Sequence, residues 1–178
     1  MNYLVVDLEG TCCNDGLIPD DERETIEIGA VLLTPDATAI ADFCAFVRPV
    51  RHPELTPFCK DLTTIGQADV DRADTFRTVF PQFVAWSSGH GPSLFCSWGR
   101  YDPEQFGRDC EYQAVPYPFA THVDLAREFR RKTGRKRGHR GAMRHFGVSP
   151  EGVHHRGIAD ARNIAKLVPY VMCDRTVE

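Results

Sequence analysis

The chain has 178 residues, of which 42% are hydrophobic and 26% are charged, and its formal net charge is −4. This length predicts a single domain over residues 1–178, and the charge excludes a generally basic protein but not a local basic patch. No apolar run approaches the roughly 18 residues of a membrane span, and the N-terminus has no basic leader, so we expect a cytoplasmic protein without a signal peptide or membrane segment.

Seven cysteines are scattered along the chain without a C-x-x-C pair. Their odd number and their spacing fit neither a disulfide framework nor a zinc site. We therefore interpret them as reduced thiols, which agrees with a cytoplasmic location. The adjacent Cys12 and Cys13 are interpreted as packing residues in preference to reactive ones.

The first part of the chain is predicted to form strands. Tyr3–Val6 is a short apolar run ahead of a glycine, which is typical of a buried strand. Residues 25–33 (TIEIGAVLL) and 39–49 (AIADFCAFVRP) predict two further strands, and the turn at Pro35 and Asp36 makes them an antiparallel hairpin.

The remainder alternates between predicted helices and strands, which indicates an α/β protein whose mixed sheet is covered by helices. In chain order these elements are helices at Leu55–Leu62, Gly66–Val70 and Thr75–Ser87, a strand at residues 94–98, a helix at Pro103–Gln113, a strand at Thr121–Asp124, and helices at Leu125–Lys132, Gly141–Phe146 and Ile158–Val171.

Two carboxylates follow the first strand two residues apart, so Asp7 and Glu9 point to the same face. Two such charges ~4 Å apart repel by about 4 kcal/mol at an effective dielectric of 20. Either one carboxyl binds a proton or a cation lies between them. The alternative is that both acids lie in a solvated loop at the end of the strand.

Two later segments favour the cation. SWGRYD places Asp102 just after the predicted strand at residues 94–98, and α/β proteins bind ligands at the carboxyl ends of strands. HHRGIAD places His155 five residues before Asp160, in the first turn of the last predicted helix. Each segment alone also fits an ordinary structural acid, but the three together indicate one site.

Four carboxylates with a histidine form an oxygen-rich site that selects Mg²⁺ or Mn²⁺ over zinc. Two such ions can hold a phosphodiester together with its attacking and leaving oxygens, and a histidine is a natural proton acceptor for the attacking water. The predicted cofactor is therefore two Mg²⁺ or Mn²⁺ ions.

The segments DLEGT, SWGRYD and HHRGIADARNIAKL resemble, in order and spacing, the three motifs of the DEDDh branch of the DnaQ-like 3′–5′ exonucleases. This resemblance implies an RNase H-like fold, with a five-stranded mixed sheet flanked by helices, and a single exonuclease domain. It also implies that Asp7, Glu9 and Asp160 hold one metal and that Asp7 reaches the second. Asp102 would act directly or through water.

The resemblance also implies that His155 is the general base, because its spacing to Asp160 matches the motif. The neighbouring His154 lacks this spacing, and a contact to substrate or to another site residue is the less favoured interpretation of it. Two nearby cations are expected to keep His155 neutral, as a base requires.

Further segments, FVRPVRHPELTPFCKDLTTIGQADVDRADTF and CSWGRYDPEQF, resemble the exoribonucleases that act on histone mRNA and in RNA interference, and the bacterial sporulation-inhibitor-like exonucleases. Thr64 stands where that branch often has Gly, which concerns loop geometry and not chemistry. The resemblance implies single-stranded nucleic acid as the partner and RNA as the preferred substrate.

Candidate contacts to the terminal nucleotide lie beside the acids. Gly10 and Thr11 could approach its sugar through their backbone, and Trp98 and Tyr101 could stack on bases, with core packing an equally good interpretation of both rings. Glu27, near the site in this family, is interpreted as structural.

Nine of the 21 Lys and Arg residues lie between Arg127 and Arg144. A charge run is often only a solvated face, but its place before the third motif favours binding of the phosphate backbone, with Arg135, Lys136 and Arg137 as candidate contacts. Such contacts give affinity without sequence preference.

The predicted function is a metal-dependent 3′–5′ exonuclease that acts on single-stranded RNA. The alternatives are a preference for DNA or short oligonucleotides, a phosphodiesterase of small nucleotides, and a catalytically silent RNA-binding module. The sequence does not choose between Mg²⁺ and Mn²⁺. It also does not identify the physiological RNA, the tolerance of structured 3′ ends, the oligomeric state or any protein partner.

Overall fold

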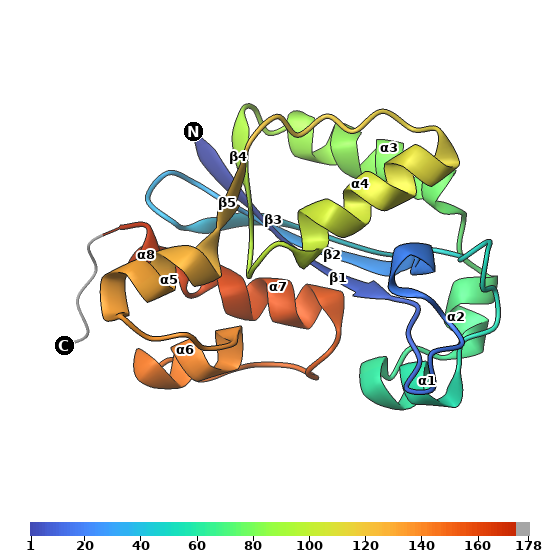
Figure 1. Ribbon diagram of the computed structural model, residues 1–178. Coiled ribbons are helices and arrows are strands. Elements are labelled where there is room, and N and C mark those ends of the chain that lie inside the picture. Colours follow the sequence, from blue (N-terminus) through green and yellow to red (C-terminus); the bar gives the residue numbers. More distant parts are fainter. Residues whose placement is uncertain (174–178) are drawn as a thin grey trace.

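The computed structural model describes residues 1–173, and residues 174–178, at the end of the expected domain, lie outside the described part. Five strands form one mixed sheet in the order β3-β2-β1-β4-β5 (Figure 1). β1 pairs antiparallel with β2 and parallel with β4, β2 pairs antiparallel with β3, and β4 pairs parallel with β5. The strands span Asn2–Gly10 (β1), Thr25–Leu33 (β2), Ala39–Phe46 (β3), Ser93–Ser97 (β4) and His122–Asp124 (β5).

Helices cover both faces of the sheet, so the predicted α/β fold with a five-stranded mixed sheet is confirmed (Figure 1). One face carries α3 and α4, the other carries α5 to α8, and α1 and α2 lie beyond the carboxyl end of β1. The helices span Pro57–Thr63 (α1), Gln67–Asp71 (α2), Phe76–Ser88 (α3), Tyr101–Gln113 (α4), Leu125–Thr133 (α5), His139–His145 (α6), Gly157–Ala165 (α7) and Val168–Val171 (α8), with a short 3₁₀ turn at Asp20–Glu22.

The alternation along β1 decides where its acids point. Leu4, Val6 and Leu8 pack into the core beneath α3 and α4, whereas Val5 packs on the side of α7. Because side chains alternate faces along a strand, Asp7 and Glu9 lie on the α7 side with Val5.

An aromatic core fixes α4 against the sheet. Phe76 and Phe80 of α3 stack with their ring centroids 4.7 Å apart, and Phe106 of α4 meets Phe80 edge-on at 4.9 Å. Pairs of this kind contribute about 0.5–1.5 kcal/mol each beyond the burial of their area. The first turn of α4, which carries Asp102, is therefore held in a defined position.

The predicted helix at Ile158–Val171 is wrong as a single element, because α7 ends at Ala165 and α8 begins at Val168. Pro169 has no amide proton to donate to the preceding turn, and a proline disfavours helical backbone in the residue before it. The predicted helix at Gly141–Phe146 begins two residues earlier, at His139. This places His139 within the first turn of α6.

Thr64 ends α1 in the left-handed conformation, with a φ of 59°. Such a φ is favoured by glycine and is unusual for a β-branched residue. The backbone at this position therefore suits glycine best. The presence of Thr64 where the exoribonucleases that this chain resembles often have Gly thus affects the backbone of this turn.

All seven cysteines lie in the described part of the chain and have free thiols. Within residues 1–173, every helix is too short or too polar to cross a membrane.

Candidate active site

Asp7 and Glu9 occupy the carboxyl end of β1, as predicted, and face the first turn of α7. Burial raises the pKa of Asp7 well above its usual value, and the charges of Asp102, Glu9 and Asp160 raise it further. Glu9 is 8% exposed, and its burial together with the charges of Asp160 and other acids raises its pKa to about 8. Both shifts favour the protonated carboxyls, and a bound cation would favour the ionised ones instead.

Asp102 is the second residue of α4 and is 4% exposed. Its Oδ1 accepts a hydrogen bond from the amide of Leu8, the residue between the two acids of β1, at 2.9 Å. Burial raises the pKa of Asp102 to about 6, although the bond from Leu8 opposes the shift. This bond ties the second motif to the first.

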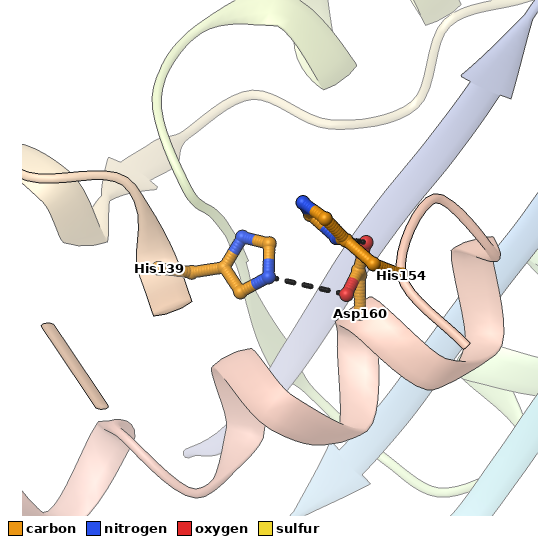
Figure 2. A group of neighbouring side chains, drawn as sticks. All are labelled: His139, His154 and Asp160. Atoms are coloured by element: carbon orange, nitrogen blue, oxygen red, sulfur yellow. Dashed lines mark hydrogen bonds and ion pairs between the residues drawn. The ribbon is translucent and has the colours of Figure 1, made fainter. Parts of the chain in front are cut away.

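Asp160 lies in the first turn of α7 and is 2% exposed. Its Oδ1 is 3.1 Å from Nε2 of His139, and its Oδ2 is 2.8 Å from Nδ1 of His154 (Figure 2). The amide of His155 also donates to Oδ2, at 2.9 Å. Burial raises the pKa of Asp160, but the hydrogen bonds and charge of the histidines outweigh it and lower the pKa to about 2.

His155 adopts a left-handed backbone conformation, with a φ of 59°, in the turn that precedes α7. Its ring stacks on that of His154 with the centroids 3.9 Å apart. Burial and the neighbouring His154 lower the pKa of His155, which favours the neutral imidazole, whereas Asp160 opposes the shift. One ring nitrogen of His155 and oxygens of Glu9 and Asp160 lie within 4.8 Å of one another.

A buried ion pair anchors this turn to the sheet. Glu27 of β2 is fully buried and accepts hydrogen bonds from Arg156 at 3.0 and 3.2 Å and from the amide of Gly157 at 2.9 Å. A Cβ on Gly29 would lie 2.0 Å from the carbonyl carbon of Gly157, so β2 and the start of α7 touch through their backbones. Glu27 is thus structural, as interpreted from the sequence, and it fixes the segment that carries His155 and Asp160.

The donor chemistry of this site fits hard divalent cations. Asp7, Glu9, Asp102 and Asp160 supply carboxylate oxygens, and three of them have pKa values raised by burial or by one another. Mg²⁺ and Mn²⁺ prefer such oxygen ligands, and their charge would offset the mutual repulsion of the acids. The five residues proposed from the sequence thus come from three distant segments and meet at one end of the sheet.

Gly10 and Thr11 are largely engaged in backbone packing. The amide of Thr11 donates to the carbonyl of Glu24 at 2.8 Å, and its Oγ1 accepts from the amide of Glu24 at 3.0 Å. A Cβ on Gly10 would lie 2.5 Å from the hydroxyl oxygen of Tyr101. Tyr101 remains 38% exposed, so part of its ring is open to a ligand.

Trp98 is half-buried against Phe129, with ring centroids 5.9 Å apart. Its indole N–H donates to the carbonyl of Arg137 at 3.1 Å. Arg135, Lys136 and Arg137 are all exposed in the loop between α5 and α6. Trp98 therefore holds this basic loop close to the second motif.

Sequence reasoning missed His139. It lies 21 residues before Asp160, inside the run that was interpreted only for its charge, and no spacing motif connects the two residues. His139 is the first residue of α6, and the predicted helix began too late to include it.

The defining sequence pattern of the exonuclease family (RNase_T) matches residues 4–168. "ERI1 exoribonuclease 2" of Danio rerio is 31% identical over 198 residues, which cover 96% of this chain and 35% of that protein. "3'-5' exonuclease eri1" of Schizosaccharomyces pombe is 31% identical over 207 residues, covering 98% of this chain and 69% of that protein. The chain thus spans about a third of the zebrafish relative.

Among solved structures, the nuclease domain of 3'hExo, described as a DEDDh family member bound to rAMP, superposes with a TM-score of 0.89 at 27% identity. The match covers 97% of this chain and 92% of that domain. The resemblance drawn from the three motifs is confirmed.

Proposed function

The chain belongs to the exonuclease family, and we propose that it is a metal-dependent 3′–5′ exonuclease that removes nucleotides from the 3′ end of single-stranded RNA. The observation that carries this proposal is the meeting of Asp7, Glu9, Asp102, Asp160 and His155 at the carboxyl end of β1. Residues 1–178 would form a single catalytic domain, and its seven free thiols suit a reducing compartment such as the cytoplasm.

In this proposal Asp7, Glu9 and Asp160 hold one cation, and Asp7 and Asp102 hold a second, with Asp102 acting directly or through water. When bound, Mg²⁺ or Mn²⁺ supplies charge that stabilises the phosphorane-like transition state and lowers the pKa of water. The raised pKa values of Asp7 and Glu9 support this assignment, since these acids gain most from a neighbouring positive charge.

His155 accepts the proton of the water that attacks phosphorus. Its lowered pKa supports a neutral ring at physiological pH, and its position beside Glu9 and Asp160 brings it to the acids. Two interactions position the ring: the hydrogen bond from the His155 amide to Asp160, and the ion pair between Arg156 and Glu27. His154, already bonded to Asp160, serves to orient that carboxylate.

The choice of RNA is supported by the names of the relatives and by the rAMP in the similar nuclease domain. The exposed Arg135, Lys136 and Arg137 lie in the loop held by Trp98 and would contact the phosphate backbone. The exposed part of Tyr101 and the backbone of Gly10 and Thr11 would meet the terminal nucleotide.

The test uses single-stranded RNA labelled at its 5′ end and the matching DNA, each incubated with Mg²⁺, Mn²⁺ or EDTA. We expect a ladder that shortens one nucleotide at a time with either metal, faster on RNA, and no change in EDTA. Asp7→Asn should abolish the ladder, whereas the control Asp61→Asn, at an exposed position of α1, should retain it.

Two outcomes would replace the proposal. Faster shortening of the DNA than of the RNA would show that the enzyme prefers DNA. Intact oligonucleotides in every metal, together with RNA binding that survives Asp7→Asn, would identify a catalytically silent binding module.

A further inference from the structure

A second group of metal-ligating atoms lies beside the candidate active site and shares one residue with it. One ring nitrogen of His139, one ring nitrogen of His154 and a carboxylate oxygen of Asp160 all lie within 4.8 Å of one another. Figure 2 shows the two rings approaching Asp160 from α6 and from the turn before α7. Each ring contacts a different oxygen of the carboxylate, at 3.1 Å for His139 and 2.8 Å for His154.

The burial of these side chains suits a bound ion. The side chain of His139 is 13% exposed, that of Asp160 is 3% exposed and that of His154 is 35% exposed. The rings of the two histidines stand edge-to-face, with their centroids 5.3 Å apart. The group is therefore largely enclosed but keeps one side open, through which an ion and a water ligand can enter.

The donor set differs from that of the four acids. Two imidazole nitrogens with one carboxylate oxygen suit zinc and similar transition metals, whereas the all-oxygen set suits Mg²⁺ and Mn²⁺. Zinc bonds of about 2.0–2.2 Å hold ligand atoms within about 4 Å of one another. A movement of the rings by at most about 1 Å would therefore assemble the site.

We propose that His139, His154 and Asp160 form a binding site for a transition-metal ion of the Zn²⁺ class, and that its occupation withdraws Asp160 from the Mg²⁺ or Mn²⁺ site and inhibits the enzyme. Asp160 belongs to both groups, since it also lies within 4.8 Å of Glu9 and His155. The binding stands independently of the proposed function, and the inhibition rests on it.

The binding test measures Zn²⁺ alone, in competition with a chromogenic chelator, on the intact protein without substrate. Removal of a residue that only hydrogen-bonds to a metal ligand lowers metal affinity by about 10–100-fold. Because His139→Gln and His154→Gln each remove a ligand itself, each should lower the Zn²⁺ affinity by at least about 100-fold. His145→Gln, which removes an exposed imidazole from the same helix, is the matched control and should bind Zn²⁺ like the parent. The cysteines are common to all variants and cancel in the comparison.

Glu9→Gln tells which of the two groups of ligands holds Zn²⁺, because Glu9 belongs only to the group that contains His155. Retention of the Zn²⁺ site in Glu9→Gln and its loss in both His139→Gln and His154→Gln would support the proposal. Loss in Glu9→Gln with retention in His139→Gln would place the ion among the catalytic acids and overturn it. Equal binding by all variants would overturn it as well. Far-UV circular dichroism of each variant establishes that it is folded.

The inhibition test adds Zn²⁺ to the RNA assay at a fixed Mg²⁺ concentration. The parent and His145→Gln should lose activity at a Zn²⁺ concentration at least tenfold lower than the one that inhibits His139→Gln. A protein without nuclease activity would contradict the proposed function and leave the chelator measurement to decide the binding site. Equal inhibition of the parent and His139→Gln would overturn the inhibitory role.

Discussion

Glu9→Gln should stabilise the protein when divalent metal is absent, even though Glu9 is a candidate ligand. Glu9 is 8% exposed, and its pKa of about 8 in the folded protein stands above the 4.5 of an unperturbed glutamate. A carboxyl whose pKa rises on folding contributes its full stability below the unfolded pKa and loses it as the pH rises toward the folded one. The relevant window is therefore pH 4.5 to 8.

The magnitude follows from the same two values. Each pH unit in this window costs about 1.4 kcal/mol, so the titration of Glu9 removes about 3 kcal/mol between pH 4.5 and pH 7. Glutamine has nearly the same shape and does not titrate. The unfolding free energy of Glu9→Gln should therefore exceed that of the parent by about 3 kcal/mol at pH 7 and by little at pH 4.5.

Urea unfolding in EDTA at several pH values measures this difference. The control is Glu54→Gln at an exposed position, which should match the parent at every pH. Mg²⁺ or Mn²⁺ should then stabilise the parent more than Glu9→Gln, because the ion binds the ionised carboxylate that glutamine lacks. A difference between Glu9→Gln and the parent that stays constant from pH 4.5 to pH 7 would refute the reasoning.

Three further predictions concern the backbone contacts and the basic loop. Gly29→Ala should lower the unfolding free energy measured in urea by about 1–3 kcal/mol, because the added Cβ would overlap Gly157. It should also slow RNA shortening, because the overlap displaces α7. The control is Gly107→Ala, whose added Cβ meets no atom within 4 Å and which should not destabilise the protein. Thr64→Gly should raise the unfolding free energy by about 1 kcal/mol, since Thr64 has a φ of 59°; an unchanged urea midpoint would contradict the strain. Replacing Arg135, Lys136 and Arg137 together by Gln should weaken RNA binding and flatten its dependence on salt, as measured by fluorescence anisotropy, and an unchanged salt slope would exclude the loop from the phosphate path.

The acids of the site were predictable because a strand fixes which residues share a face. Asp7 and Glu9 are two residues apart on a mostly apolar strand, so the sequence alone predicts that they point to the same face. Asp102 and Asp160 each lie in the first turn of a helix, and the order of the elements brings those turns to the same edge of the sheet. The fold was predictable for the same reason, since its strands and most helices have clear periodicity.

The contacts that depend on side-chain direction were not predictable. Whether Trp98 stacks on a base or packs inside depends on the path of the loop at Arg137, to which its indole bonds. The approach of His139 to Asp160 depends on where α6 begins, and the sequence marked that helix two residues late. The break before α8 required weighing Pro169 against an otherwise helical apolar pattern.

The loop between α5 and α6 is attached, where it enters α6, to two segments that carry candidate active-site acids. The carbonyl of Arg137 receives the indole N–H of Trp98, four residues before Asp102, and two residues further on His139 contacts Asp160. Under the proposed function, RNA bound to this loop would therefore act at once on the segments that carry Asp102 and Asp160. Longer substrates should accordingly raise kcat as well as lower KM, since part of their binding energy goes into aligning the acids rather than into holding the strand.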